Sequence, residues 1–152
     1  FRRVLFRSKW HQKAQKRGFK NGIKKEECNN HDVMYHMCEK KDWEKAVESQ
    51  TPYFPSNFEQ EGFIHATSIP QKLIDTANQF YTDSKCDDWI CLELSRSAFT
   101  SIGIIIKDES PVFPHIYGGI STKKSLGLVA NSYQMIRNSE DGTFVKIVGV
   151  TD

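Results

Sequence analysis

Three histidines could carry chemistry in this chain, because each stands in a segment that is otherwise apolar or turn-forming. His36 lies in VMYHMC, His65 in EGFIHAT and His115 in FPHIYGG. An imidazole can serve as a general acid, a general base, a metal ligand or a hydrogen-bond donor near neutral pH. A lone histidine on an apolar strand is more often a satisfied core residue. A structural interpretation therefore competes with a functional one for all three.

The order of these segments is compatible with one shared cleft. If the segments that carry His36 and His65 form neighbouring strands, those strands lie about 4.8 Å apart. Two imidazoles and the hydroxyl of Thr67 could then converge, beside the segment that carries His115. Gly62, which opens the second segment, would allow a close approach of its backbone.

Of four kinds of site considered, three are compatible with these residue types and one is excluded. Three histidines could bind a metal that keeps an open position, although no HxH or HxxxH spacing supports this. Cys38 or Cys91 could pair with a histidine as a nucleophile, but neither stands in a recognisable nucleophile turn. No GxGxxG or Walker loop is present. Finally, the histidines could donate hydrogen bonds to a nucleotide while Tyr35 or Tyr117 stacks on one of its rings.

Two carboxylates stand apart from the rest. Glu61 directly precedes Gly62, and Glu93 alternates with Cys91 along an apolar segment. Either could act as a general base. A solvated position is the favoured interpretation for both.

Hydrophobic periodicity and turn residues predict the elements that position these groups. We expect one amphipathic helix over residues 39–49 and a second from Ser68, as N-cap, to Thr82, with Pro70 in its first turn. Residues 110–119 are expected to form an irregular loop shaped by two prolines and two glycines, and Asp141-Gly142 a hairpin turn. The continuously apolar segment 102–106 is expected to be a central strand. The expected strands are 33–38, 62–67, 89–94, 102–106, 127–130, 133–136 and 144–150.

This order, with helices early and strands late, predicts an α+β fold. The chain of 152 residues is long enough for one domain with a proper core. Its net charge of +2 hides two unlike parts. Residues 1–25 carry ten Lys or Arg and no acidic residue, whereas the remainder carries eleven basic and nineteen acidic residues.

The segment FRRVLFRS, residues 1–8, resembles a translated sequencing adapter. We therefore predict that residues 1–32 are a basic, disordered and artefactual leader, and that Met34 is the start. The predicted domain is 33–150. With the leader set aside, nucleic acid is not an expected partner.

The cysteines and the hydropathy indicate the compartment. Cys28, Cys38, Cys86 and Cys91 form no CxxC pair, which favours free thiols in a reducing compartment. No apolar run approaches the ~20 residues that span a bilayer, and no signal peptide is evident. The prediction is a cytoplasmic protein without a membrane partner.

Several motifs, in order, resemble the family called domain of unknown function 952. The resemblance covers about residues 34–148, and EGFIHAT together with FPHIYG is its most specific part. The matching residues are Met34-Tyr35-His36, Trp43, Tyr53-x-Pro55, Glu61 to Thr67, Phe113 to Gly118 and Asp141-Gly142-Thr143-Phe144.

The resemblance implies a fold similar to that of ADP-ribosyltransferases, a split and mainly antiparallel β core with two or three helices packed on it. In that superfamily a first-strand histidine, here His36, contacts the ribose of NAD. A second-strand motif is matched by 62–67, with His65 facing the pocket. The usual catalytic Glu on a later strand has no clear counterpart. A branch that transfers a tRNA 2′-phosphate to NAD also lacks it.

We therefore expect a nucleotide or NAD-type cleft with ADP-ribosyl transfer or NAD cleavage as its candidate activity. A non-catalytic ligand-binding module on the same fold is the first alternative, and a metal-dependent hydrolase is the second. The candidate cofactor is NAD, and the expected partner is a small nucleotide-like ligand. The candidate catalytic residues are His36, His65 and His115, and the candidate cofactor-binding residues are Tyr35, Gly62, Thr67 and Tyr117.

Overall fold

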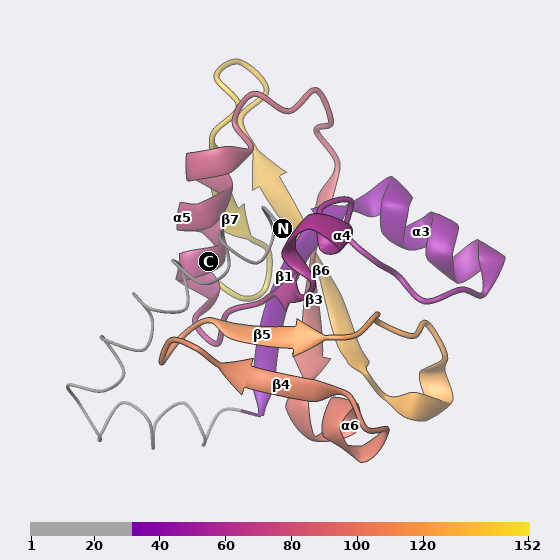
Figure 1. The fold of residues 1–152 in the computed structure, drawn as a ribbon. Helices are drawn as coiled ribbons and strands as arrows, with labels where there is room; N and C mark the ends of the chain where they lie inside the picture. The colour runs from indigo at the N-terminus through magenta and orange to yellow at the C-terminus, as the bar shows by residue number, and fades with distance from the viewer. Residues whose placement is uncertain (1–31) are drawn as a thin grey trace.

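Two antiparallel sheets form the frame of the domain. The structure is a computed structural model that describes residues 32–152 (Figure 1). The first sheet has the strand order β1-β3-β6-β7, and the second has the order β2-β5-β4. The strands are β1 (Val33–Glu39), β2 (Ile64–His65), β3 (Trp89–Ser95), β4 (Ile105–Asp108), β5 (Pro114–Tyr117), β6 (Val129–Arg137) and β7 (Phe144–Ile147). The helices are α3 (Lys40–Ser49), α4 (Phe58–Glu61), α5 (Pro70–Phe80), α6 (Arg96–Ser101) and the 3₁₀ turn η1 (Lys124–Leu126).

The inner strand β3 is buried on both faces, because its side chains contribute to two hydrophobic cores. Ile90 and Leu92 point to one face, and Trp89 and Cys91 point to the other. The first core lies against the second sheet, and the other lies against α5. In Figure 1, β4 and β5 run across β1 and β3, while α5 stands beside β7. The domain is thus a stack of three layers, with the four-stranded sheet in the middle.

The two sheets are joined at strand β1. The backbone N–H of Tyr35 donates to the Thr67 carbonyl at 2.8 Å, and the N–H of Thr67 donates to the Tyr35 carbonyl at 2.9 Å. This single antiparallel bridge continues the first sheet into the segment that follows β2. It confirms that the segments carrying His36 and His65 are neighbours.

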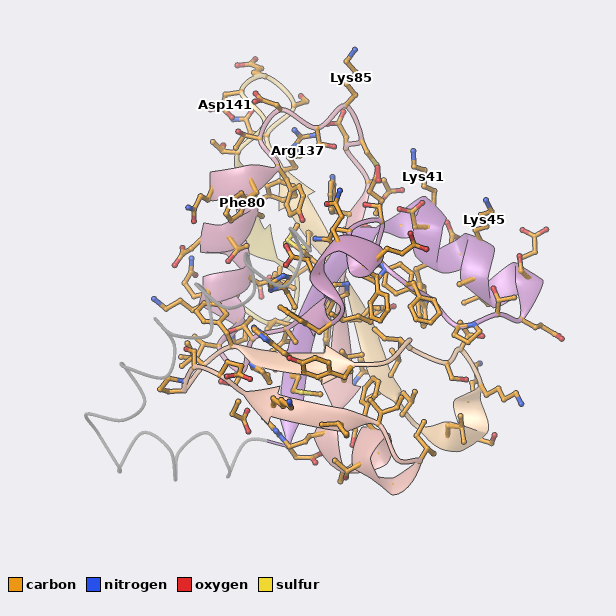
Figure 2. The ribbon with its side chains drawn as sticks, in the orientation of Figure 1. Lys41, Lys45, Phe80, Lys85, Arg137 and Asp141 are labelled. Carbon is orange, nitrogen blue, oxygen red and sulfur yellow. The ribbon has the colours of Figure 1, made fainter. Side chains whose placement is uncertain are left out.

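Helices α3 and α5 differ in how much they bury. Leu73, Ile74 and Ala77 of α5 are buried at helical spacing against the first sheet. In α3 only Ala46 is buried, and the helix extends away from the sheets, with Lys41 and Lys45 on its surface (Figures 1 and 2).

The predicted start of α5 was wrong by one residue. Ile69 is the N-cap, and Pro70 opens the helix as expected. The hydroxyl that accepts from the Ile69 N–H, at 3.1 Å, belongs to Thr67 instead of Ser68.

The predicted central strand over 102–106 was also wrong. Ile102 caps the short helix α6, whose start is fixed by the Ser95 hydroxyl, which accepts from the Ala98 N–H. Gly103 then turns the chain with φ of 85°. Only the end of the segment joins β4, an edge strand in which Ile105 is 60% exposed.

The other strand predictions need smaller corrections. Residues 110–119 are not all loop, because 114–117 form β5, the central strand of the second sheet. Of the expected strand 62–67 only Ile64–His65 pairs as a strand. The two strands expected over 127–136 are one strand, β6. The β6–β7 hairpin around Asp141-Gly142 is confirmed, as is the α+β class.

Arg137, at the end of β6, organises the apex of the domain. Its guanidinium donates to four carbonyl oxygens, those of Tyr81, Thr82, Cys86 and Gly142, and to the Asp87 carboxylate. All five N–H groups are therefore used, and the side chain is only 3% exposed. Figure 2 shows it below the loop that carries Asp141.

Arg137→Lys is expected to lower the free energy of unfolding by about 3 kcal/mol, because an ammonium cannot replace the five-donor fork. Chemical denaturation monitored by circular dichroism measures this loss. Lys45→Ala, on the exposed surface of α3, is the control and should change stability by less than about 0.5 kcal/mol. Equal stability of Arg137→Lys and the unsubstituted protein would contradict this role.

None of the helices within residues 32–152 is long and apolar enough to cross a membrane. Cys38, Cys86 and Cys91 are free thiols. Cys28 and the predicted leader lie outside the described residues, apart from residue 32 at its end.

Candidate functional site

Four aromatic or imidazole rings gather on the outer face of β2 and β5. His65 and His115 are register partners across the two strands, with ring centroids 5.4 Å apart. Phe63 stacks on His115 with centroids 3.8 Å apart and planes at 8°, and it also contacts His65 and Tyr117. We call Phe63, His65, His115 and Tyr117 the ring cluster. It forms because alternation places Ile64 and Ile116 on the opposite, core-facing side of the same strands.

Within the ring cluster the exposure is uneven. Phe63 and His115 are almost completely buried, whereas the His65 side chain is 44% exposed. Tyr117 is half-buried, and the ammonium of Lys107 lies 5.2 Å from its ring centroid. His65 is therefore the imidazole of the cluster that a ligand can reach directly.

His36 lies on the inner side of this arrangement. Alternation along β1 points it, with Met34 and Cys38, towards the second sheet, where it is 7% exposed. Its Nδ1 lies 2.7 Å from the carbonyl oxygen of His65, and its Nε2 lies 3.4 Å from the hydroxyl of Tyr53. His36 thus touches His65 through the backbone and not through the ring cluster.

Burial fixes the charge state of His36. Removal of the ring from water lowers the pKa of His36 to about 4, although its hydrogen bond to His65 opposes this. The imidazole is neutral at pH 7. Burial also raises the pKa of the Cys38 thiol to about 12, so this cysteine is not an activated nucleophile. The same holds for Cys91, whose pKa burial also raises to about 12.

Glu61 is the carboxylate that accompanies His65. Its Oε1 lies 3.8 Å from Nε2 of His65, across the turn that ends α4. Gly62 makes this turn with φ of 80°, and its N–H donates to the Phe58 carbonyl. A residue with a side chain would be strained there. Burial of the ring lowers the pKa of His65 to about 4.

Two of the predicted cofactor-binding residues lie elsewhere. Tyr35 is on the α5 side of β1, where burial and the charge of Glu93 raise its pKa. Glu93 lies on that same side and accepts from the Tyr133 hydroxyl at 2.9 Å. Thr67 is buried, and its hydroxyl donates to the Val112 carbonyl at 2.9 Å. The Thr67 hydroxyl therefore stabilises the local backbone through this hydrogen bond.

The sequence reasoning missed Tyr53 and the role of Phe63. Tyr53 stands between two prolines, yet it is 5% exposed and pairs with Ile120 through two backbone hydrogen bonds. Phe63 is 1% exposed and belongs to the ring cluster. The signal that could have found both is the motif Tyr53-x-Pro55 and the period-2 relation between Phe63 and His65.

A metal centre is not supported by the geometry. Among residues 32–152, no group of three or more His, Cys, Asp or Glu is arranged to hold a metal ion. The His36 nitrogens face a carbonyl and a hydroxyl, and His65 and His115 lie on the other side of the second sheet.

The chain is thus an antiparallel α+β domain of two sheets, and the ring cluster lies on the smaller sheet. The chain belongs to the family described as "Protein of unknown function (DUF952)", whose model matches residues 37–127. None of the curated proteins compared with the chain matches it.

Solved structures of protein CC0527 from Caulobacter crescentus share the fold. The X-ray structure is 16% identical over 74% of this chain and 93% of that one, with a TM-score of 0.55. The X-ray structure of a double mutant is 17% identical over the same shares, with a TM-score of 0.56. The solution NMR structure is 14% identical over 72% of this chain and 90% of that one, with a TM-score of 0.53.

The neutral state of His36 predicts acid lability. Its folded-state pKa of about 4 lies below the ordinary value, so the unfolded chain binds the proton more readily. Its contribution to stability is therefore complete above about pH 6.5 and is lost as the pH falls to about 4, for a total of about 3 kcal/mol.

Urea denaturation between pH 7.5 and pH 4 measures this loss. His36→Gln, which cannot titrate in this range, is expected to give a stability profile flatter by about 3 kcal/mol. Parallel profiles for the two proteins would show that His36 does not titrate as described.

Proposed function

We propose that this domain binds a small nucleotide of the NAD type on the outer face of β2 and β5. The observation that carries the proposal is the ring cluster itself, in which a partly exposed imidazole stands at the edge of packed aromatic rings. The half-buried ring of Tyr117 offers stacking to a base, and His65 offers a hydrogen-bond donor or acceptor to a hydroxyl or phosphate. Ligand sites generally combine apolar and aromatic side chains with a small number of placed polar groups.

The proposal extends to the fold. Two antiparallel sheets that cross, with helices packed outside them, are what an ADP-ribosyltransferase-like domain would need. We propose this assignment for residues 33–150, with His65 as the ligand-facing residue and Tyr117 as the ring that a base would approach. His115 would pack against Phe63 and His65 in the buried part of the site, and Gly62 would form the turn between Glu61 and Phe63.

A small ligand suits the charge of the domain better than a nucleic acid does. Residues 26–152 carry eleven basic and nineteen acidic residues, and affinity for a polyanion comes mainly from basic contacts to phosphates. Lys107, beside Tyr117, is a cation that could meet the one or two phosphates of a nucleotide.

A binding module is better supported than an enzyme. Both ring nitrogens of His36 are engaged within the protein, so the first-strand histidine does not face a ligand. Glu61 is the carboxylate at 3.8 Å from the exposed imidazole. Catalysis of NAD cleavage would require that pair to stabilise the departing nicotinamide and the ribosyl cation.

Nucleotide binding is expected to raise the thermal stability of the protein. ADP-ribose or NAD present at 100 times its Kd should add about 2.7 kcal/mol to the free energy of unfolding. His65→Ala should lose most of this gain, because it removes the exposed polar group of the ring cluster. Lys45→Ala on α3 should keep it. The absence of a shift with any nucleotide would refute the proposal.

Catalysis is tested separately by incubating the protein with NAD and measuring nicotinamide by mass spectrometry. As a binding module, the domain should leave NAD intact, with nicotinamide release no faster than in buffer. Release by the unsubstituted protein that disappears in both His65→Ala and Glu61→Gln would instead establish an NAD-cleaving enzyme.

A further inference from the structure

We infer that His36 is a positioning residue, which acts on the ligand through the backbone of His65 and does not contact the ligand itself. For its consequence on binding, this inference rests on the proposed function. The geometry of His36 stands apart from that function and can be tested without a ligand.

The two contacts of His36 define one tautomer. A neutral imidazole has one donor and one acceptor. The carbonyl oxygen of His65, 2.7 Å from Nδ1, can only accept, so the proton is on Nδ1. Nε2 is then an acceptor, and the hydroxyl of Tyr53 donates to it across 3.4 Å. Both hydrogen-bonding positions of the ring are used by the protein.

Tyr53 is itself held in place, so its hydroxyl has a fixed position next to Nε2 of His36. Its N–H donates to the Ile120 carbonyl at 2.8 Å, and its carbonyl accepts from the Ile120 N–H at 2.9 Å. Its ring meets Trp43 edge-on, with centroids 5.9 Å apart. The thiol of Cys38 interacts with the same hydroxyl. A chain of polar groups therefore runs from Cys38 through Tyr53 and His36 to the backbone of His65.

Strand β2 needs this bond more than a longer strand would. It has only two residues, so few ladder bonds fix its position. The neighbouring bonds are those from the Ala66 N–H to the Pro114 carbonyl, at 3.2 Å, and the Tyr35–Thr67 bridge. The bond from His36 is shorter than any of these. It sets the peptide plane from which the His65 side chain projects towards Glu61.

The first test uses the unsubstituted protein. Long-range ¹⁵N–¹H NMR correlations distinguish the two nitrogens of each histidine, and a coupling across the hydrogen bond identifies its acceptor. At pH 7 we expect a neutral His36 with the proton on Nδ1, coupled to the carbonyl carbon of His65. A proton on Nε2, or a charged ring, would overturn the inference.

The second test compares two substitutions by their Kd for ADP-ribose. In His36→Asn the amide nitrogen can replace Nδ1 as donor to the His65 carbonyl, and binding should stay within about threefold of the unsubstituted protein. His36→Leu keeps apolar volume without a donor, and binding should weaken about tenfold, as expected for one lost hydrogen bond.

Two outcomes of this comparison would overturn the inference. Equal weakening by Asn and Leu would show that the imidazole ring itself meets the ligand, and Leu with unchanged affinity would show that His36 does not position His65. If His36→Leu does not fold, the Asn variant and the NMR tautomer still decide. If the unsubstituted protein binds no nucleotide, the proposed function fails, while the tautomer measurement alone judges the role of His36.

Discussion

The bridge between the two sheets is the contact on which the rest of the domain depends. Two backbone hydrogen bonds join Tyr35 to Thr67, and the imidazole of His36 adds a third bond to the His65 carbonyl. Without them β1 would be an unpaired edge, and the two-residue strand β2 would have only β5 as its partner. Because the bridge lies at the middle of β1, it fixes where the second sheet crosses the first. The place of the ring cluster follows from that crossing.

Because successive side chains point to opposite faces of a strand, neighbouring residues of these sheets lie in two separate environments. In β1 the even-numbered residues face the second sheet and the odd-numbered residues face α5. His36 and Tyr35, although adjacent in sequence, therefore belong to different layers. In β2 and β5 the same rule sends Ile64 and Ile116 inwards and His65 and His115 outwards. His65 and His115 therefore point to the outer face because each stands one residue away from a core-facing isoleucine.

The sequence predicted elements well where the signal was local. Strand β1 was placed within one residue, and α3 and the β6–β7 hairpin followed from helical spacing and from Asp141-Gly142. It failed where tertiary partners decide. The apolar segment 102–106 contains a helix end and a glycine turn, and the segment with Pro114 is a strand because β2 and β4 pair with its two edges. The convergence of His65 and His115 could be expected only as a possibility, since their strands are fifty residues apart in sequence.

The site also shows why a similar fold supports fewer conclusions about function than similar side-chain contacts do. At 14–17% identity, the similarity to CC0527 speaks for the arrangement of sheets and for nothing finer. A first-strand histidine can serve a ligand only if one ring nitrogen is left for it, and in this chain both nitrogens are engaged by Tyr53 and by the His65 backbone. Burial keeps His36 neutral and strengthens its hydrogen bond to the backbone of the short strand β2. The same burial makes His36 poorly suited to face a ligand. If the domain binds a ligand as proposed, the imidazole of His65 is the one placed to meet it, because it is the more exposed ring and stands beside Glu61 and the stacked pair of Phe63 and His115.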